Sequence, residues 1–173
     1  MAQKMESPMK KITVAKVVLN MGVGKSGDPI ERAKRALLQI SGQQPNPRAA
    51  KATQRDWGVH KGEPIGVAVT VRKAPALELI KRLVTAKGSQ LKSSSFDEFG
   101  NVSFGIREHI DIPGVKYDPE VGIVGLNITI SLTRPGFNIR VRSKHKASIG
   151  VNHIITSEHA KEFMAREFGV QVI

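Results

Sequence analysis

The sequence predicts an α+β fold, with a largely antiparallel sheet that carries helices on one face and polar side chains on the other. Two observations support this fold class. Four segments alternate apolar and polar side chains with the two-residue period of a strand, and three others repeat apolar side chains at helical spacing. No internal repeat is visible, so we expect a single domain over residues 1–173.

The first expected strand covers residues 12–21. Its core side holds Ala15, Val17, Leu19 and Met21. A glycine-rich stretch follows. Asp28 can cap the next helix, because Pro29 suits the first helical position and Glu31 stands at the capping-box spacing. The apolar stripe of this helix is Ile30, Ala33, Leu37 and Ile40, and Gly42 ends it.

Residues 43–63 lack helical periodicity, so we expect a long exposed loop or ribbon there. A second strand is predicted at residues 65–72. Its apolar side is Ile65, Val67, Val69 and Val71. A second helix is predicted from about Pro75 to Lys87 and ends at Gly88. Its inward side chains are Leu77, Ile80 and Val84.

Two more strands are predicted at residues 101–110 and 126–133. In the first, Val102, Phe104 and Ile106 alternate with Ser103, Arg107 and His109. After the second, the alternation calls for an apolar side chain, but the chain supplies Arg134 before the break at Pro135-Gly136. A last amphipathic helix is predicted at about 157–168. Its apolar face is Ala160, Phe163, Met164 and Phe168.

Charge is the strongest compositional signal. The chain has 27 Lys and Arg against 15 Asp and Glu, a net charge of +12, which favours a polyanionic partner. Residues 93–120 are acidic, residues 121–157 hold no acidic side chain, and residues 1–10 resemble a loose basic arm. No apolar run approaches the roughly 20 residues of a membrane span, and no apolar segment follows Lys4 as in a signal peptide. Cysteine is absent, which excludes disulfides. We therefore expect a cytoplasmic nucleic-acid binder with no membrane partner.

If the four strands share one sheet, its second face is polar. That face displays Lys16, Asn20, Thr70, Arg72, Ser103, Arg107, Asn127, Thr129 and Ser131. Short donors and acceptors with a few cations suit hydrogen bonds to ribose 2′-hydroxyls and phosphates across the shallow minor groove of RNA. A solvated sheet face is the alternative, and the net charge favours RNA. Further candidates for RNA contact are Arg134 and the cations of a basic loop at residues 135–150, Arg140, Arg142, Lys144 and Lys146.

The stretch Gly22–Gly27 lies between a strand and a helix and raises a second hypothesis, a small nucleotide-binding protein. A Walker A loop needs an earlier glycine, separated by four residues from its final Gly-Lys. That position falls at Leu19, inside the strand. Asp28 would also repel the phosphate at the helix start. A third hypothesis is a general basic RNA chaperone, which would bind any RNA equally at matched salt.

Catalytic and metal chemistry find no support in the sequence. Glu108, His109 and Asp111 could suggest a cluster, but neighbours on a strand point to opposite faces. No second histidine stands at metal-ligand spacing. We therefore predict that the chain is not an enzyme and uses no metal, cofactor or small-molecule substrate. Trp57 is the one aromatic candidate for base stacking, although packing as a loop anchor is the favoured interpretation.

Several motifs occur together along the chain. They are residues 16–24 (KVVLNMGVG), 42–45 (GQQP), 65–72 (IGVAVTVR), 99–101 (FGN), 105–110 (GIREHI), 116–119 (KYDP) and 125–127 (GLN). Together they resemble the large-subunit ribosomal protein family five over nearly the whole chain. The ending, with residues 134–137 (RPGF), a basic loop and a last helix, resembles the archaeal and eukaryotic branch. Short tails and the lack of cysteine favour an archaeal source.

The resemblance implies a structural protein that binds 5S ribosomal RNA, helps attach it to the central protuberance and contacts large-subunit rRNA. The positions that match family contacts to 5S RNA are Lys16, Asn20, Gln43, Thr70 and Arg72. The loop at about 53–62 resembles the family loop that reaches P-site tRNA, here with Arg55, Trp57, His60 and Lys61. The family also contacts a small-subunit head protein, an intersubunit bridge that charge assigns to region 97–120. The loop at 135–150 is expected to become ordered only against RNA.

Overall fold

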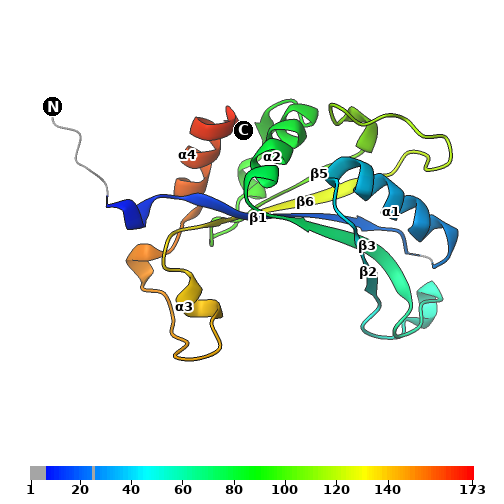
Figure 1. Cartoon of the computed structure of the whole chain (residues 1–173), viewed down its shortest axis with the longest axis horizontal. Coiled ribbons are helices and arrows are strands. Elements are labelled where there is room, and N and C mark those ends of the chain that lie inside the picture. The colour runs from blue at the N-terminus through cyan, green and yellow to red at the C-terminus, as the bar shows by residue number, and fades with distance from the viewer. Residues whose placement is uncertain (1–6, 25) are drawn as a thin grey trace.

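The computed structural model describes residues 7–24 and 26–173 and confirms the α+β fold (Figure 1). Its main sheet has the strand order β2-β3-β1-β6-β5, and every neighbouring pair is antiparallel. The strands are β1 (Thr13–Gly22), β2 (Asn46–Ala49), β3 (Pro64–Val71), β5 (Val102–Ile106) and β6 (Leu126–Thr133). Two short strands, β4 (Gln90–Leu91) and β7 (Gln171–Val172), form a separate parallel pair.

Three longer helices cover one face of the main sheet (Figure 1). They are α1 (Asp28–Ser41), α2 (Ala74–Ala86) and α4 (Ser157–Phe168). A fourth, short helix, α3 (Asn138–Val141), lies on the opposite side of the sheet (Figure 1). Within residues 7–24 and 26–173, no helix has the length and apolar character needed to cross a bilayer. Of the expected basic arm, residues 1–6 lie outside the described residues, and Pro8–Lys10 form a 3-10 turn.

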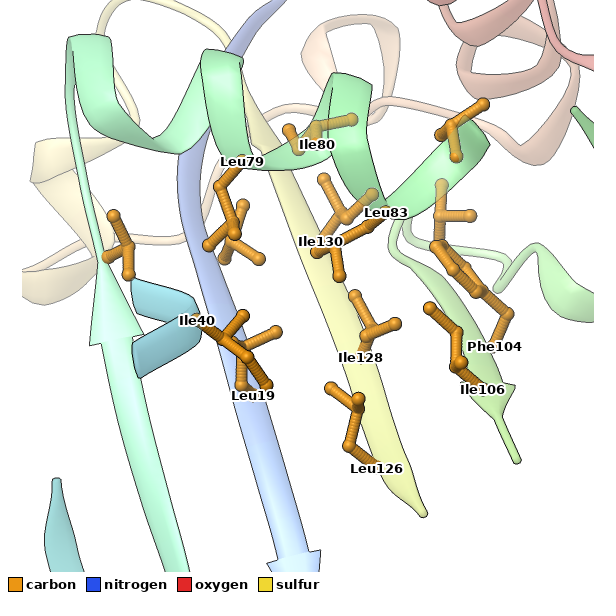
Figure 2. Packing of buried hydrophobic residues seen from close by; sticks show 14 of the residues in the cluster. Leu19, Ile40, Leu79, Ile80, Leu83, Phe104, Ile106, Leu126, Ile128 and Ile130 are labelled. Carbon is orange, nitrogen blue, oxygen red and sulfur yellow. The ribbon is translucent and has the colours of Figure 1, made fainter. Parts of the chain in front are cut away.

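The hydrophobic core fills the space between the sheet and its three covering helices. Leu19 of β1 and Ile128 and Ile130 of β6 lie beneath Leu79, Ile80 and Leu83 of α2, and Ile40 of α1 completes the layer over β1 (Figure 2). These side chains are at most 2% exposed. Burying one leucine or isoleucine stabilises a fold by about 1.5–3 kcal/mol, so this layer supplies much of the driving force for folding.

The predicted stripe of α1 is confirmed, but the predicted cap is wrong. Gly27 precedes the helix, and Asp28 is its first residue with no side-chain cap hydrogen bond. In α2, Leu77 is 44% exposed instead of inward. The stripe of α2 is Ala76, Leu79, Ile80, Leu83 and Val84, a run with i, i+3, i+4 spacing. Leu77 stands one position off that phase, and the alanine at position 76 takes the inward place.

Two positions predicted from alternation lie elsewhere. The register of β1 against β6 shifts between Val14 and Lys16, so Ala15 sits in a bulge and Val14 packs on the core in its place. β5 ends at Ile106, four residues earlier than expected, and His109 is fully buried in a 3-10 turn instead of standing on the polar face. The Val124 N–H donates to His109 Nδ1 at 3.3 Å, which ties this turn to the segment before β6.

Candidate nucleic-acid interface

The uncovered face of the main sheet presents short polar side chains in rows that cross the strands. The paired positions of the central row are Asn46, Ala68, Asn20, Asn127 and Gly105. The next row contains Thr70, Val18, Thr129 and Ser103. We call these two rows, together with Lys16, Arg72 and Ser131 at their end, the polar face.

Small residues keep the central row shallow. Ala68 and Gly105 stand beside the asparagines, and a methyl group at position 105 would lie 3.3 Å from Oδ1 of Asn127. Within the described chain, the side-chain amides of Asn46, Asn20 and Asn127 make no hydrogen bond to protein. Each free amide offers two donors and one acceptor to an approaching ligand.

A groove of about 960 Å³ adjoins the polar face and extends it toward α3. Lys16, Arg72 and Ser131 line it from the sheet, and Arg140 and Lys146 line it from the basic loop. Two predicted cations of the sheet and two of the loop at 135–150 therefore meet in one concave surface. This convergence could not be read from the sequence, because about 60 residues separate Arg72 from the loop.

The loop at 135–150 contains the helical turn α3, where the sequence suggested no regular structure. Arg142 closes the loop, because its Nε and Nη2 donate to the His145 carbonyl at 2.9 and 2.6 Å. The Ala147 N–H also donates to the Ile139 carbonyl. Arg140, Arg142, Lys144 and Lys146 are all exposed. The loop thus offers four cations on a frame with internal hydrogen bonds.

Besides the loop at 135–150, residues 50–63 form a second protrusion. It extends from the same side of the sheet as α3 (Figure 1). Gln54 and Val59 pair as a bridge, and the tip between them holds Arg55 and Trp57. The interpretation of Trp57 as a packed anchor is wrong, because its side chain is 79% exposed. The other predicted contact residues of this protrusion, Arg55, His60 and Lys61, are exposed as well.

Glu63 fastens the base of that protrusion. Its carboxylate accepts hydrogen bonds from the His60 N–H and from the Ser26 hydroxyl. The backbone hydrogen bond from His60 and then the Ser26 hydroxyl lower the pKa of Glu63; desolvation opposes them, and the charge of the His60 side chain lowers the pKa by the least. The protrusion is therefore tied to the glycine-rich stretch that follows β1.

The hydrogen bonds of that glycine-rich stretch weigh against the nucleotide-binding hypothesis. The N–H groups of Val23 and Gly24 both donate to the Ile65 carbonyl, so β3 already uses donors that a phosphate loop would need. The Ser26 hydroxyl donates to Glu63, a second carboxylate near the stretch besides Asp28. Lys25 lies outside the described residues.

Two predicted contact residues lie off the polar face. Gln43 is exposed in the turn between α1 and β2. Arg134 is only 6% exposed, and its Nη1 donates to the carbonyls of His153 and Ile154 at 3.4 and 3.5 Å. Arg134 continues the core-facing alternation of β6, so its side chain points to the helix side of the sheet. Arg134 is therefore set apart from the exposed loop cations, and its contact with RNA stays a prediction.

Few carboxylates neutralise the cations of this surface. Within residues 7–24 and 26–173, the ion pairs are Lys34–Glu31, Arg35–Glu120 and Arg166–Glu167. None involves a cation of the polar face or of the two protrusions. The Arg35–Glu120 pair, at 2.7 Å, and the hydrogen bond from Gln39 to the Lys116 carbonyl hold the acidic segment against α1.

Catalytic and metal chemistry remain without geometric support. Among the described residues, no three His, Cys, Asp or Glu side chains gather as a metal site. His109 is enclosed by the core and cannot meet a substrate in this conformation.

Comparisons with known proteins agree along the chain. The family model described as "Ribosomal protein L5" matches residues 7–60, and the model for the C-terminus of the same ribosomal protein family matches residues 64–154. Similar archaeal proteins all carry the name large ribosomal subunit protein uL5. The protein from Nitrosopumilus maritimus is 67% identical over 99% of each chain. That from Cenarchaeum symbiosum is 60% identical over 98% of this chain and all of its own, and that from Pyrobaculum aerophilum is 45% identical over 95% and 92%.

Proposed function

This chain belongs to the ribosomal protein L5 family, and from that premise we propose that its polar face binds 5S ribosomal RNA. Family membership makes it a structural, non-enzymatic constituent of the large subunit of the cytoplasmic ribosome. Its work is therefore binding and positioning of RNA, without a chemical step.

The observation that carries the proposal is the asparagine row of the polar face. Three free amides stand in line across β2, β1 and β6, separated only by a small residue at position 68. A shallow hydrogen-bonding strip of this kind fits the wide minor groove of double-stranded RNA, where 2′-hydroxyls and base edges are exposed. The flanking cations Lys16 and Arg72 suit the phosphates at the groove edge.

The central experiment compares two polar-face variants with a matched control. Asn20→Ala and Arg72→Ala should each weaken 5S RNA binding by about 1–3 kcal/mol, as expected when a polar contact is lost. Arg32→Ala removes the same charge from the exposed side of α1 and should leave the affinity nearly unchanged. Filter binding to 5S RNA and to an unrelated structured RNA of equal length, over a salt series, measures both affinity and preference. Equal affinity for the two RNAs, lost together as salt rises, would leave only the general chaperone hypothesis.

The two protrusions support contacts beyond 5S RNA. The four cations of the loop at 135–150 suit large-subunit rRNA, because they are exposed and unpaired with carboxylates among the described residues. The exposed Trp57, with Arg55 and Lys61 beside it, suits the elbow of P-site tRNA, where a ring can stack and cations can meet phosphates.

The acidic segment suits a basic protein of the small-subunit head. Six acidic and two basic residues lie between positions 93 and 120, and Glu120 at the end of this segment pairs with Arg35 of α1. Tyr117 is 57% exposed there, which adds apolar contact area to the charge. Charge reversal at Asp111 and Glu120, which are exposed and do not line the groove, should weaken subunit joining while 5S RNA binding stays unchanged, as measured by sucrose-gradient sedimentation.

A further inference from the structure

Arg134 occupies a position that the core pattern assigns to an apolar residue. It follows Leu132 on the helix side of β6 and is almost completely buried, since its exposed fraction is 6%. Among the described residues, only its Nη1 has protein acceptors, at 3.4 and 3.5 Å, distances beyond the usual range of a hydrogen bond. Its Nε–H is buried with no acceptor at all.

The guanidinium lines a pocket of about 630 Å³ between the segment before β1 and helix α4. Lys10 and Lys11, in the segment before β1, line one wall of the pocket. His159 and Arg166 line it from α4. Glu162 is the one carboxylate in the described lining, and no ion pair of the described residues includes Arg134. Cations therefore outnumber acids in the wall of this pocket.

A buried cation without an opposite charge is costly, because the lost hydration has no compensation. Neighbouring cations increase that cost. A bound anion would remove it, since it would place a negative charge beside Arg134, where this residue lines the pocket, and neutralise Lys10 and Lys11. We infer that this pocket, between the segment before β1 and α4, is an anion site that takes a backbone phosphate of RNA and shares none of its lining residues with the polar face.

The phosphate is assigned to RNA on the basis of the proposed function, whereas the anion site itself does not depend on it. RNA bound here would contact residues that the polar face does not include, namely the segment before β1 and helix α4. The protein would then hold RNA at two separate sets of residues.

The test uses the full-length protein labelled with ¹⁵N and follows the Nε–H resonance of Arg134, assigned by its loss in Arg134→Lys. Sodium phosphate is titrated against sodium chloride at equal ionic strength. We expect a shift that saturates with phosphate and not with chloride. The double variant Lys10→Ala/Lys11→Ala should weaken this response about tenfold or more, the loss that charge-assisted hydrogen bonds produce, whereas Arg32→Ala should not.

Three outcomes would overturn the inference. One is an equal response to phosphate and chloride. Another is a phosphate response that appears only after Glu162→Gln, because the carboxylate of the chain itself would then already serve the buried guanidinium. The third is displacement of phosphate by poly-glutamate but not by a short RNA duplex, which would make the ligand an acidic protein. The phosphate titration uses neither 5S RNA nor variants of the polar face. A negative titration would therefore not contradict 5S RNA binding by the polar face, and loss of 5S RNA binding would not contradict the anion site.

Discussion

The two faces of the main sheet use alternate residues of the same strands for different purposes. On the helix side, Leu19 is fully buried beneath α2 and α1. Its neighbour Asn20 is exposed on the polar face with a free amide. Stability and recognition are thus separated at the level of single positions, and neighbouring substitutions should affect one property without the other.

The largest contrast is expected between Leu19→Ala and Asn20→Ala. Leu19→Ala leaves a cavity in a packed layer and should lower the free energy of unfolding by about 2–5 kcal/mol. Asn20→Ala should change stability by no more than about 0.5 kcal/mol, because surface substitutions without special contacts rarely do more. Urea unfolding measures the first effect, and 5S RNA binding at a temperature where both variants are folded measures the second. Comparable losses of stability in both variants would contradict the separation of stability and recognition between the two faces of β1.

Two glycines give a second contrast. A methyl group at Gly66 would lie 2.8 Å from the Met21 carbonyl oxygen, a backbone atom within the β1–β3 ladder that cannot move freely. Gly66→Ala should therefore destabilise the fold by about 1–3 kcal/mol, as overpacking does. At Gly105 the nearest atom is Oδ1 of Asn127, a side-chain atom that can turn away.

Gly105→Ala should accordingly leave the melting temperature nearly unchanged while it displaces the Asn127 amide and weakens 5S RNA binding. The Asn127→Ala variant is the matched reference, since Gly105→Ala should have no additional effect on affinity in that background. Additive losses of affinity in the double variant would show that Gly105 acts independently of Asn127.

Much of this architecture follows from the sequence, and the exceptions have physical causes. Period-two alternation predicts β6 at its observed bounds and the core-facing sides of β1 and β3, although β3 also buries Gly66 and Ala68 on its other side. The last helix also has its predicted bounds, 157–168. Alternation fails at Ala15, since a bulge shifts the register of β1. It also fails at His109, since β5 ends before that residue.

The sequence also predicts which residues belong to the polar face, but it does not predict their alignment across the strands or the groove beside them. Asn20 and Asn127 follow from alternation, yet their alignment in one row depends on the pairing of β1 with β6. The groove that joins Arg72 to Arg140 depends on the path of the loop after β6. The sequence does mark Arg134 as an anomaly, because a cation interrupts an apolar series, but only the tertiary structure surrounds it with further cations.

Trp57 offers a smaller effect on the same side of the sheet. Because its ring is 79% exposed, Trp57→Ala should change stability by less than about 0.5 kcal/mol. If the ring stacks on tRNA, the variant should weaken P-site tRNA binding to reconstituted ribosomes by about 1–3 kcal/mol. Trp57→Phe keeps a stacking ring and should restore most of the affinity. Identical tRNA binding by the alanine variant and the unaltered protein would assign the ring to another contact.

The smallest expected effect concerns pH and the attachment of the 50–63 protrusion. Hydrogen bonds from the His60 N–H and the Ser26 hydroxyl favour the charged carboxylate of Glu63 and lower its pKa from 4.5 in the folded state. A lowered folded pKa means that the stabilising contribution is fully present above 4.5 and is lost as the pH falls through the folded value. Protection of the His60 amide from hydrogen exchange, relative to the intrinsic rate at each pH, should therefore fall in acid more than protection at core positions such as Leu19. Glu63→Gln should show low protection at His60 at every pH. A pH response of His60 that survives this substitution would assign the acid sensitivity to a different group, and the protrusion would then be held by the Gln54–Val59 pairing and the Ala50–Glu63 backbone hydrogen bond.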